Sequence, residues 1–181
     1  LYTQNSPLKC GKGSMYEGGV RVPFMVKWNG VVKPDTRNNT SIMIEDLFPT
    51  LLHMAQVNDY KVPQIVDGKD MVPLLEGKNE AEFNKRSIIW NFPNIWGNTG
   101  PGINLNCAIR QGDWKLIYNY ETGEKELYNI PQDIGENNNL AHANPSKVKE
   151  LSSILGKKLR QMNAQRPIVT ATSKPCAWPD E

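Results

Sequence analysis

Residues 106–120 read NCAIRQGDWKLIYNY, and their pattern indicates the fold of the C-terminal half of the chain. Residues 106–110 and 114–120 are two strand-length runs that contain β-branched and aromatic side chains. Between them, residues 111–113 place a glycine at the centre of a short polar turn, which is typical of a hairpin. The sequence therefore predicts two antiparallel strands that are neighbours in one sheet.

Flanking segments extend this hairpin into a larger unit. Residues 87–92 and 125–129 are further strand-length runs, and Thr122-Gly123 forms a turn before the second of them. Asn144 followed by Pro145 is a typical helix start, and apolar residues then recur at helical spacing: Val148, Leu151, Ile154, Leu155, Leu159 and Met162. We therefore expect an α+β unit, an antiparallel meander with a helix packed across it. From residue 167 onward we expect extended chain.

The N-terminal part has weaker patterns. Residues 21–28 form a short apolar run that predicts a buried strand. Asp46 can cap a helix that continues to about residue 56, with Leu47, Leu51 and Leu52 on its apolar face. Residues 57–85 are rich in Gly, Pro and charge, which favours a connecting segment with one helical turn near residues 72–75.

Composition excludes several classes of protein. The 181 residues are 39% hydrophobic and 22% charged, as in ordinary globular proteins, and the formal net charge is only +2. Basic residues alternate with acidic ones, so we expect no nucleic-acid partner. No apolar run approaches the roughly 18 residues of a membrane span. The three cysteines are widely spaced without a CxxC pair, which predicts free thiols.

A glycine-rich motif, CGKGSMYEGGVRVPF, occupies residues 10–24. It places one ammonium, that of Lys12, on a loop beside the predicted strand. Glycines let backbone and a cation approach an oxyanion closely. A single loop lysine is more often a solvated surface charge, so this pattern alone leaves both interpretations open.

The motif resembles the lysine loop of the sulfatase family, in which Gly-Lys is followed by Tyr-Glu-Gly-Gly-Val-Arg and Pro. Further stretches are similar to that family in the same order: DLFPTLL at 46–52, DG at 67–68, LLEG at 74–77, AIRQGDWKLI at 108–117 and ELYNI at 126–130. Asp133, Glu136 and Asn139-Leu140 continue the similarity. The chain thus resembles, over nearly its whole length, the C-terminal part of an arylsulfatase of the bacterial exported type.

The resemblance implies a domain organisation. Residues 1–60 would end an alkaline-phosphatase-like α/β catalytic domain, residues 61–85 would connect, and residues 86–181 would form the C-terminal antiparallel-sheet subdomain with its helix. The chain opens at Leu1 without methionine or leader. We therefore expect it to be a piece of a longer polypeptide and to work with the upstream remainder.

The resemblance also implies a chemistry. Sulfatases hydrolyse sulfate esters with a formylglycine, made from Cys or Ser in a CxPxR-type motif, and with a calcium ion. A lysine at the position of Lys12 is implied to contact the sulfate and to assist protonation of the departing alcohol. A fixed ammonium stabilises the negative charge spread over the sulfuryl oxygens, so we expect Lys12 to be catalytic and substrate-binding. Glu17 and Arg21 flank the Gly-Gly turn, and we expect them to support the loop.

The differences from the family pattern limit which parts of the catalytic site this chain can supply. Neither Cys10, Cys107 nor Cys176 begins a CxPxR motif, so we expect the nucleophile to lie elsewhere and the isolated chain to be inactive. The family's calcium ligands would precede the lysine loop, so we expect no complete metal site. His53 and His142 have no partner at metal-ligand spacing.

Substrate contacts are expected from the C-terminal subdomain. Many related sulfatases carry Trp-His-x-Pro-His there, whereas this chain has Trp90, Asn91, Phe92, Pro93 and Asn94. Asn91 and Asn94 could hydrogen-bond sugar hydroxyls, or they belong to a loop that merely resembles that stretch. Trp96 lies in a glycine-containing loop where an aromatic ring can cover a ligand.

Three functions remain open at this point. The leading hypothesis is a sulfuric ester hydrolase acting, after export to the periplasm, lysosome or extracellular space, on a sulfated carbohydrate or aryl sulfate. A non-catalytic carbohydrate-binding or interaction module on the same fold is the second. A phosphoester hydrolase of the same superfamily is the third, and it is disfavoured because such enzymes need more metal ligands than two histidines offer.

Overall fold

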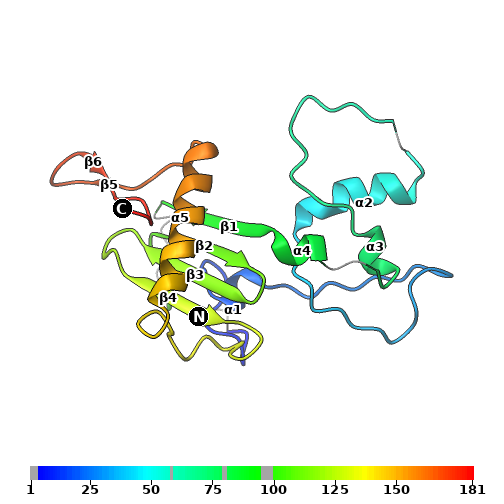
Figure 1. Ribbon diagram of the computed structural model, residues 1–181, viewed down its shortest axis with the longest axis horizontal. Coiled ribbons are helices and arrows are strands. Elements are labelled where there is room, and N and C mark those ends of the chain that lie inside the picture. The colour runs from blue at the N-terminus through cyan, green and yellow to red at the C-terminus, as the bar shows by residue number, and fades with distance from the viewer. Residues whose placement is uncertain (1–3, 58, 79–80, 95–99) are drawn as a thin grey trace. The chain divides into compact units, whose positions relative to one another are not determined.

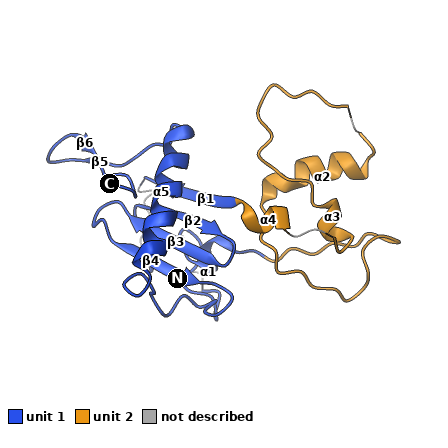
Figure 2. Cartoon of the chain, in the orientation of Figure 1, with its two compact units in different colours: residues 1–22, 87–181 blue, residues 23–86 orange. Residues whose placement is uncertain are grey.

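The chain forms two compact units in the computed structural model, which describes residues 4–57, 59–78, 81–94 and 100–181. Residues 1–22 and 87–181 form one unit, here called the sheet unit, and residues 23–86 form the other, the helical unit (Figure 2). The lysine loop therefore shares a unit with the C-terminal sheet, although the whole helical unit separates them in sequence. The domain bounds expected for the intact protein stay a prediction.

A four-stranded antiparallel meander forms the centre of the sheet unit (Figure 1). Its strands are β1 (Ser87–Phe92), β2 (Asn106–Gln111), β3 (Trp114–Asn119) and β4 (Lys125–Asn129). The predicted bounds of β1 and β4 are confirmed, and those of β2 and β3 differ by one residue. The two tight turns place Gly112 at φ 56° and Gly123 at φ 74°, a conformation that favours glycine.

The two faces of the meander are covered by different parts of the chain. Helix α5 (Pro145–Gln161) crosses one face, as predicted (Figure 1). Leu155 of this helix is buried in one cluster with Ile109 and Leu116 of the sheet. Met15 and Tyr16, from the N-terminal segment, pack on the other face. Because side chains alternate along a strand, each strand contributes one set of residues to α5 and the other set to the N-terminal segment.

The strand predicted at residues 21–28 is absent, and that prediction is wrong. These residues are extended but pair with no strand in the described part of the chain, and Met25 is 90% exposed. A strand needs a neighbour for its backbone N–H and C=O groups. An apolar run alone therefore does not make a strand. A single helical turn, α1 (Glu17–Val20), precedes this segment.

The helical unit contains a short 3-10 helix, η1 (Ile44–Asp46), and three α-helices: α2 (Leu47–Met54), α3 (Val72–Leu75) and α4 (Ala81–Lys85). A small cluster of Met71, Leu74 and Phe83 forms its core. The turn of helix at 72–75 is confirmed. The sequence predicts no further helix in the connecting segment, residues 57–85, so α4 is an additional element. Phe83, buried in the cluster, accounts for the additional helix.

Two expectations about α2 are wrong. Asp46 makes no side-chain capping bond to α2, because its carboxylate accepts the backbone N–H groups of Met43 and Lys69 instead. Leu51, expected on the apolar face of this helix, is 57% exposed, while Thr50 is buried. Thr50 is buried because its hydroxyl accepts the backbone N–H of Met71.

The C-terminal segment returns to α5, where Asp180 pairs with Arg160 of the helix. Where extended chain was expected, β5 (Ile168–Val169) and β6 (Lys174–Pro175) form a minimal hairpin. The guanidinium of Arg166 lies 4.0 Å from the ring centre of Trp178. Within the described ranges, no helix has the length and apolar character that a membrane span requires.

Candidate functional site

The lysine loop, residues 9–16, has a backbone shape that presents Lys12. Cys10 at φ 59° and Gly13 at φ 95° adopt left-handed conformations on either side of it. The carbonyl oxygen of Gly11 accepts both the N–H of Ser14, at 3.1 Å, and its hydroxyl, at 2.9 Å. The Lys12 side chain is exposed, while Gly11 and Ser14 are buried. The loop is thus a tight turn with Lys12 as an exposed residue between buried neighbours.

The Gly18-Gly19 pair explains how α1 packs onto this loop. The N–H of Gly18 donates to the carbonyl oxygen of Lys9 at 3.0 Å. A Cβ on Gly18 would collide with the carbonyl oxygens of Lys9 and Cys10, and one on Gly19 would lie 2.7 Å from that of Gly11. Only glycine permits this backbone contact. The pair therefore fixes the shape of the loop.

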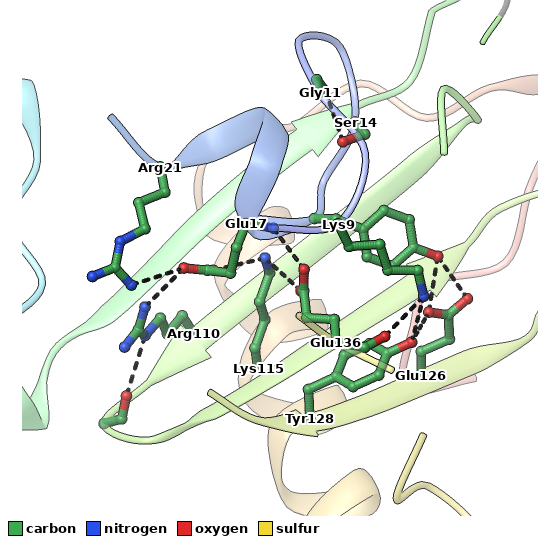
Figure 3. A network of polar contacts seen from close by, with 12 residues as sticks. Lys9, Gly11, Ser14, Glu17, Arg21, Arg110, Lys115, Glu126, Tyr128 and Glu136 are labelled. Atoms are coloured by element: carbon green, nitrogen blue, oxygen red, sulfur yellow. Dashed lines mark hydrogen bonds and ion pairs between the residues drawn. The ribbon is translucent and has the colours of Figure 1, made fainter. Parts of the chain in front are cut away.

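Glu17, the first residue of α1, points down into the sheet unit (Figure 3). Its side chain is 2% exposed. Its carboxylate lies 2.9 Å from Lys115 Nζ, 3.4 Å from Arg110 Nη1 and 3.5 Å from Arg21 Nη1. The contact between Glu17 and Arg21 agrees with the sequence-based expectation of a support for the loop, and that role stays a prediction. The sequence did not reveal the nearer partner, Lys115.

Lys115 and Glu136 complete a buried ionic cluster with Glu17 (Figure 3). Both side chains are fully buried, and Lys115 Nζ lies 2.9 Å from Glu136 Oε1. The contact joins an ammonium and a carboxylate inside the protein, so charge attraction stabilises it. Glu136 Oε2 accepts the backbone N–H of Glu17 at 2.6 Å. Burial raises the pKa of Glu136 above its ordinary value, although the Lys115 ammonium opposes this.

A second polar group secures the start of the loop. Lys9 Nζ donates to the hydroxyl oxygen of Tyr128, at 3.2 Å, and to the backbone oxygen of Glu136, at 3.0 Å. The hydroxyl of Tyr16 donates to Glu126, and the ring of Tyr16 lies 4.1 Å below the Lys9 ammonium. Burial, and then the Glu126 carboxylate, raise the pKa of both tyrosines, so both remain hydroxyl donors at neutral pH.

The strand register explains how the sheet supplies these partners. Lys115 in β3 stands opposite Arg110 in β2 and Tyr128 in β4, so the three form one row across the sheet. Leu116 and Leu127, which alternate with them, belong to the cluster under α5. The polar row therefore lies on the face that the lysine loop covers.

Three residues were expected to bind sugar. One lies on the sheet face opposite the lysine loop, one is exposed in a bend, and one is outside the described residues. Asn91, in β1, donates from Nδ2 to the backbone oxygen of Gln165 at 2.9 Å and accepts the Tyr120 hydroxyl at 2.8 Å. Tyr120 belongs to the cluster under α5, so these contacts lie on the face opposite the loop. Asn94 is exposed in a bend, and Trp96 lies outside the described residues. Their binding of substrate stays a prediction.

The described residues do not fit a metal centre, and the sequence has no motif for the family nucleophile. Among the described residues, no three His, Cys, Asp or Glu side chains lie close enough together to hold a metal ion. The three cysteines are free thiols, and burial raises the pKa of Cys107 to about 12. No cysteine or serine begins a CxPxR or SxPxR motif. No catalytic step is therefore assigned to a metal or a formylglycine on this chain.

Comparison with known proteins identifies the family. The family model described as "N-sulphoglucosamine sulphohydrolase, C-terminal" matches residues 10–165. This chain belongs to the sulfatase family. A protein named Sulfatase from Formosa agariphila is 36% identical over 167 residues, which are 87% of this chain and 30% of that protein. The N-acetylgalactosamine-6-O-sulfatase of Bacteroides thetaiotaomicron is 30% identical over 161 residues, 80% of this chain and 28% of that protein.

A solved structure confirms the fold. The crystal structure of Ps i-CgsB in complex with k-i-k-neocarrahexaose superposes with a TM-score of 0.68 at 27% identity, covering 91% of this chain and 34% of that one. The chain thus spans about a third or less of the length of these relatives. It is the C-terminal part of a sulfatase, with the corresponding portion of the alkaline-phosphatase-like fold, as the sequence predicted.

Proposed function

We propose that the full-length protein is a sulfatase that removes sulfate from a carbohydrate, and that this chain supplies Lys12 to the reaction. One observation carries the proposal. In a chain of the sulfatase family, Lys12 is exposed on a loop whose backbone is fixed by buried glycine and carboxylate contacts. A surface lysine without function needs no such support. This combination favours a cation held for a ligand.

The chemistry of sulfate transfer suits a fixed ammonium. The sulfuryl group carries negative charge on its oxygens, and the departing alcohol develops more as the S–O bond breaks. A cation held at that position stabilises the transition state without reorganising. Lys12 would donate hydrogen bonds to a sulfate oxygen and help to protonate the departing oxygen. The family's calcium ion and formylglycine would come from the upstream part of the protein.

The proposal that the substrate is a carbohydrate rests on what the names of similar proteins say. One acts, by its name, on 6-O-sulfated N-acetylgalactosamine, and another is solved with a neocarrahexaose. We propose a sulfated sugar for this protein too, with Asn91, Asn94 and Trp96 as candidate contacts, and aryl sulfates as convenient artificial substrates. We further propose that the protein is exported, since sulfated polysaccharides are extracellular.

Sulfate release by the full-length protein tests this proposal. N-acetylgalactosamine 6-sulfate, sulfated carrageenan oligosaccharides and 4-nitrophenyl sulfate would be supplied, and inorganic sulfate would be measured. Lys12→Met should lower kcat by about 100-fold or more, as loss of one preorganised charge-stabilising donor does. Lys147→Met is the matched control, because it removes an ammonium from α5, on the other face of the sheet, and should leave kcat unchanged.

Four results would contradict the proposal. Equal activity of Lys12→Met and the wild type would remove the assigned role of Lys12. Sugar binding without sulfate release would support the carbohydrate-recognition module, and release of phosphate from phosphate esters would support the phosphoester hydrolase. Sulfatase activity in the isolated 181-residue chain would show that the nucleophile lies within it after all.

A further inference from the structure

We infer that Lys115 and Glu136, two residues of the C-terminal sheet unit that the solvent does not reach, are positioning residues that hold Lys12 in its reactive place. The inference deepens the proposed function and, in its kinetic part, rests on it. Neither residue touches substrate in this account. They act through the two ends of the lysine loop, and Lys12 lies between those ends.

Glu136 binds both ends of the lysine loop: Lys9, its first residue, and Glu17, the residue that directly follows it. Its backbone oxygen accepts the Lys9 ammonium at 3.0 Å, three residues before Lys12. Its Oε2 accepts the backbone N–H of Glu17 at 2.6 Å, five residues after Lys12. Glu136 therefore contacts both ends, and the backbone hydrogen bond from Gly18 to Lys9 joins those ends directly. Any shift of Glu136 is transmitted directly to the segment that carries Lys12.

Lys115 makes this arrangement electrostatically possible. Without it, the carboxylates of Glu17 and Glu136 would face each other inside the protein, since both are at most 2% exposed. The Lys115 ammonium lies 2.9 Å from an oxygen of each. Arg110 and Arg21 add further cations, but only to Glu17, at 3.4 Å and 3.5 Å. Two buried like charges repel strongly at low dielectric, so the bridging ammonium is essential to the contact.

The position of the cluster in the fold supports a role in aligning the loop. Lys115 lies in the middle of the sheet, and the sheet is fixed on its other face by the core under α5. The loop is thus joined, through Glu17, to an interior strand of the sheet. Ion pairs that only stabilise a fold do not need to converge on the backbone N–H of a catalytic loop. Buried ionic groups are best attested where they fix one register or arrangement.

A double-mutant cycle in the full-length enzyme tests the kinetic part. Lys115→Met keeps the length of the side chain and removes its charge. With 4-nitrophenyl sulfate we expect a loss of about 100-fold in kcat, because a displacement of about 1 Å has that effect. In the Lys12→Met background the same substitution should change kcat by no more than about twofold, since it acts through Lys12. If Lys115→Met lowers kcat by the same factor in the wild-type and the Lys12→Met background, the inference is overturned.

A second readout does not depend on activity. The Glu17 amide donates to Glu136, so its hydrogen exchange should rise by about tenfold or more in Lys115→Met, together with other amides of residues 9–17. Arg86→Met, which removes a buried cation from the helical unit, is the control and should leave exchange in residues 9–17 unchanged. Exchange unchanged in Lys115→Met would overturn the inference.

A further variant and the wild type separate the possible failures. If Lys115→Met does not fold, Glu136→Ala replaces it, because it removes the oxygen that accepts the Glu17 N–H while Lys115 stays paired with Glu17. The same loss of kcat and the same rise in exchange are expected, and wild-type values in both would overturn the inference. If the wild type releases no sulfate from any substrate, the proposed function fails, and hydrogen exchange alone decides whether Lys115 positions the loop.

Discussion

Arg86→Met should open the helical unit around Asp46. The Asp46 carboxylate is fully buried and accepts four hydrogen bonds: two from the Arg86 guanidinium, both at 2.7 Å, and two from the backbone N–H groups of Met43 and Lys69. The substitution removes the two charge-assisted bonds and leaves a buried carboxylate without its cation.

The magnitude follows from those contacts. Hydrogen bonds to charged groups contribute about 1.5–3 kcal/mol each, and breaking a buried ion pair costs about 3–5 kcal/mol. Within the described residues, Arg86 Nε is buried without a hydrogen-bond partner, so the substitution also relieves a small penalty. We therefore expect a loss of about 3 kcal/mol in the free energy of unfolding of the helical unit.

The effect should depend on pH in a defined direction. Burial alone would raise the pKa of Asp46, but the hydrogen bonds from Arg86, Lys69 and Met43 outweigh it and lower the pKa. Stability from a lowered pKa is present above the ordinary value, about 3.9, and is lost as the pH falls through the folded-state value. Without Arg86 the pKa should rise instead. The difference between variant and wild type should therefore be largest at neutral pH and shrink towards pH 4.

Hydrogen exchange of the Met43 and Lys69 amides in the intact protein measures this directly. Lys78→Met is the matched control, because it breaks a contact to Glu76 of similar length, 3.0 Å, whose side chains are 70% and 37% exposed. Exposed pairs contribute at most about 1 kcal/mol. The reasoning is refuted if Arg86→Met costs no more than Lys78→Met, or if its cost is as large at pH 4 as at pH 7.

Three further outcomes follow from the sheet unit. Leu155→Ala empties a fully buried position between α5 and the sheet, so thermal unfolding should show a loss of about 2–5 kcal/mol, and a loss below 1 kcal/mol would contradict the packing. Gly18→Ala should displace the loop backbone and lower kcat of the full-length enzyme while Lys12 is intact, and unchanged kcat would contradict the close contact. Iodoacetamide at pH 8, followed by peptide mapping, should label Cys10 before Cys107, which burial keeps protonated, and the reverse order would contradict the burial assignment.

Local patterns predicted the sheet unit well and the helical unit poorly. The strands and α5 form where short-range signals agree: glycine turns, alternating side chains and Asn144-Pro145 at a helix start. Residues 21–28 show the opposite case, because their apolar run indicates burial while the partner that would bury it is not local. The prediction that Asp46 caps a helix is wrong for a related reason. Its carboxylate is taken by Lys69 and Arg86, far along the chain.

The family, the strands and the loop that carries Lys12 could all be predicted from the amino-acid sequence, because motifs, turns and glycine requirements act over a few residues. It also showed Lys115 and Glu136, but gave no reason to bury them. Only the tertiary structure decided that, by laying the lysine loop over one face of the sheet and joining Glu17 to Lys115 and Glu136, 98 and 119 positions away. A charge inside a protein is stable only beside its counter-charge, and that pairing exists only once the chain has folded.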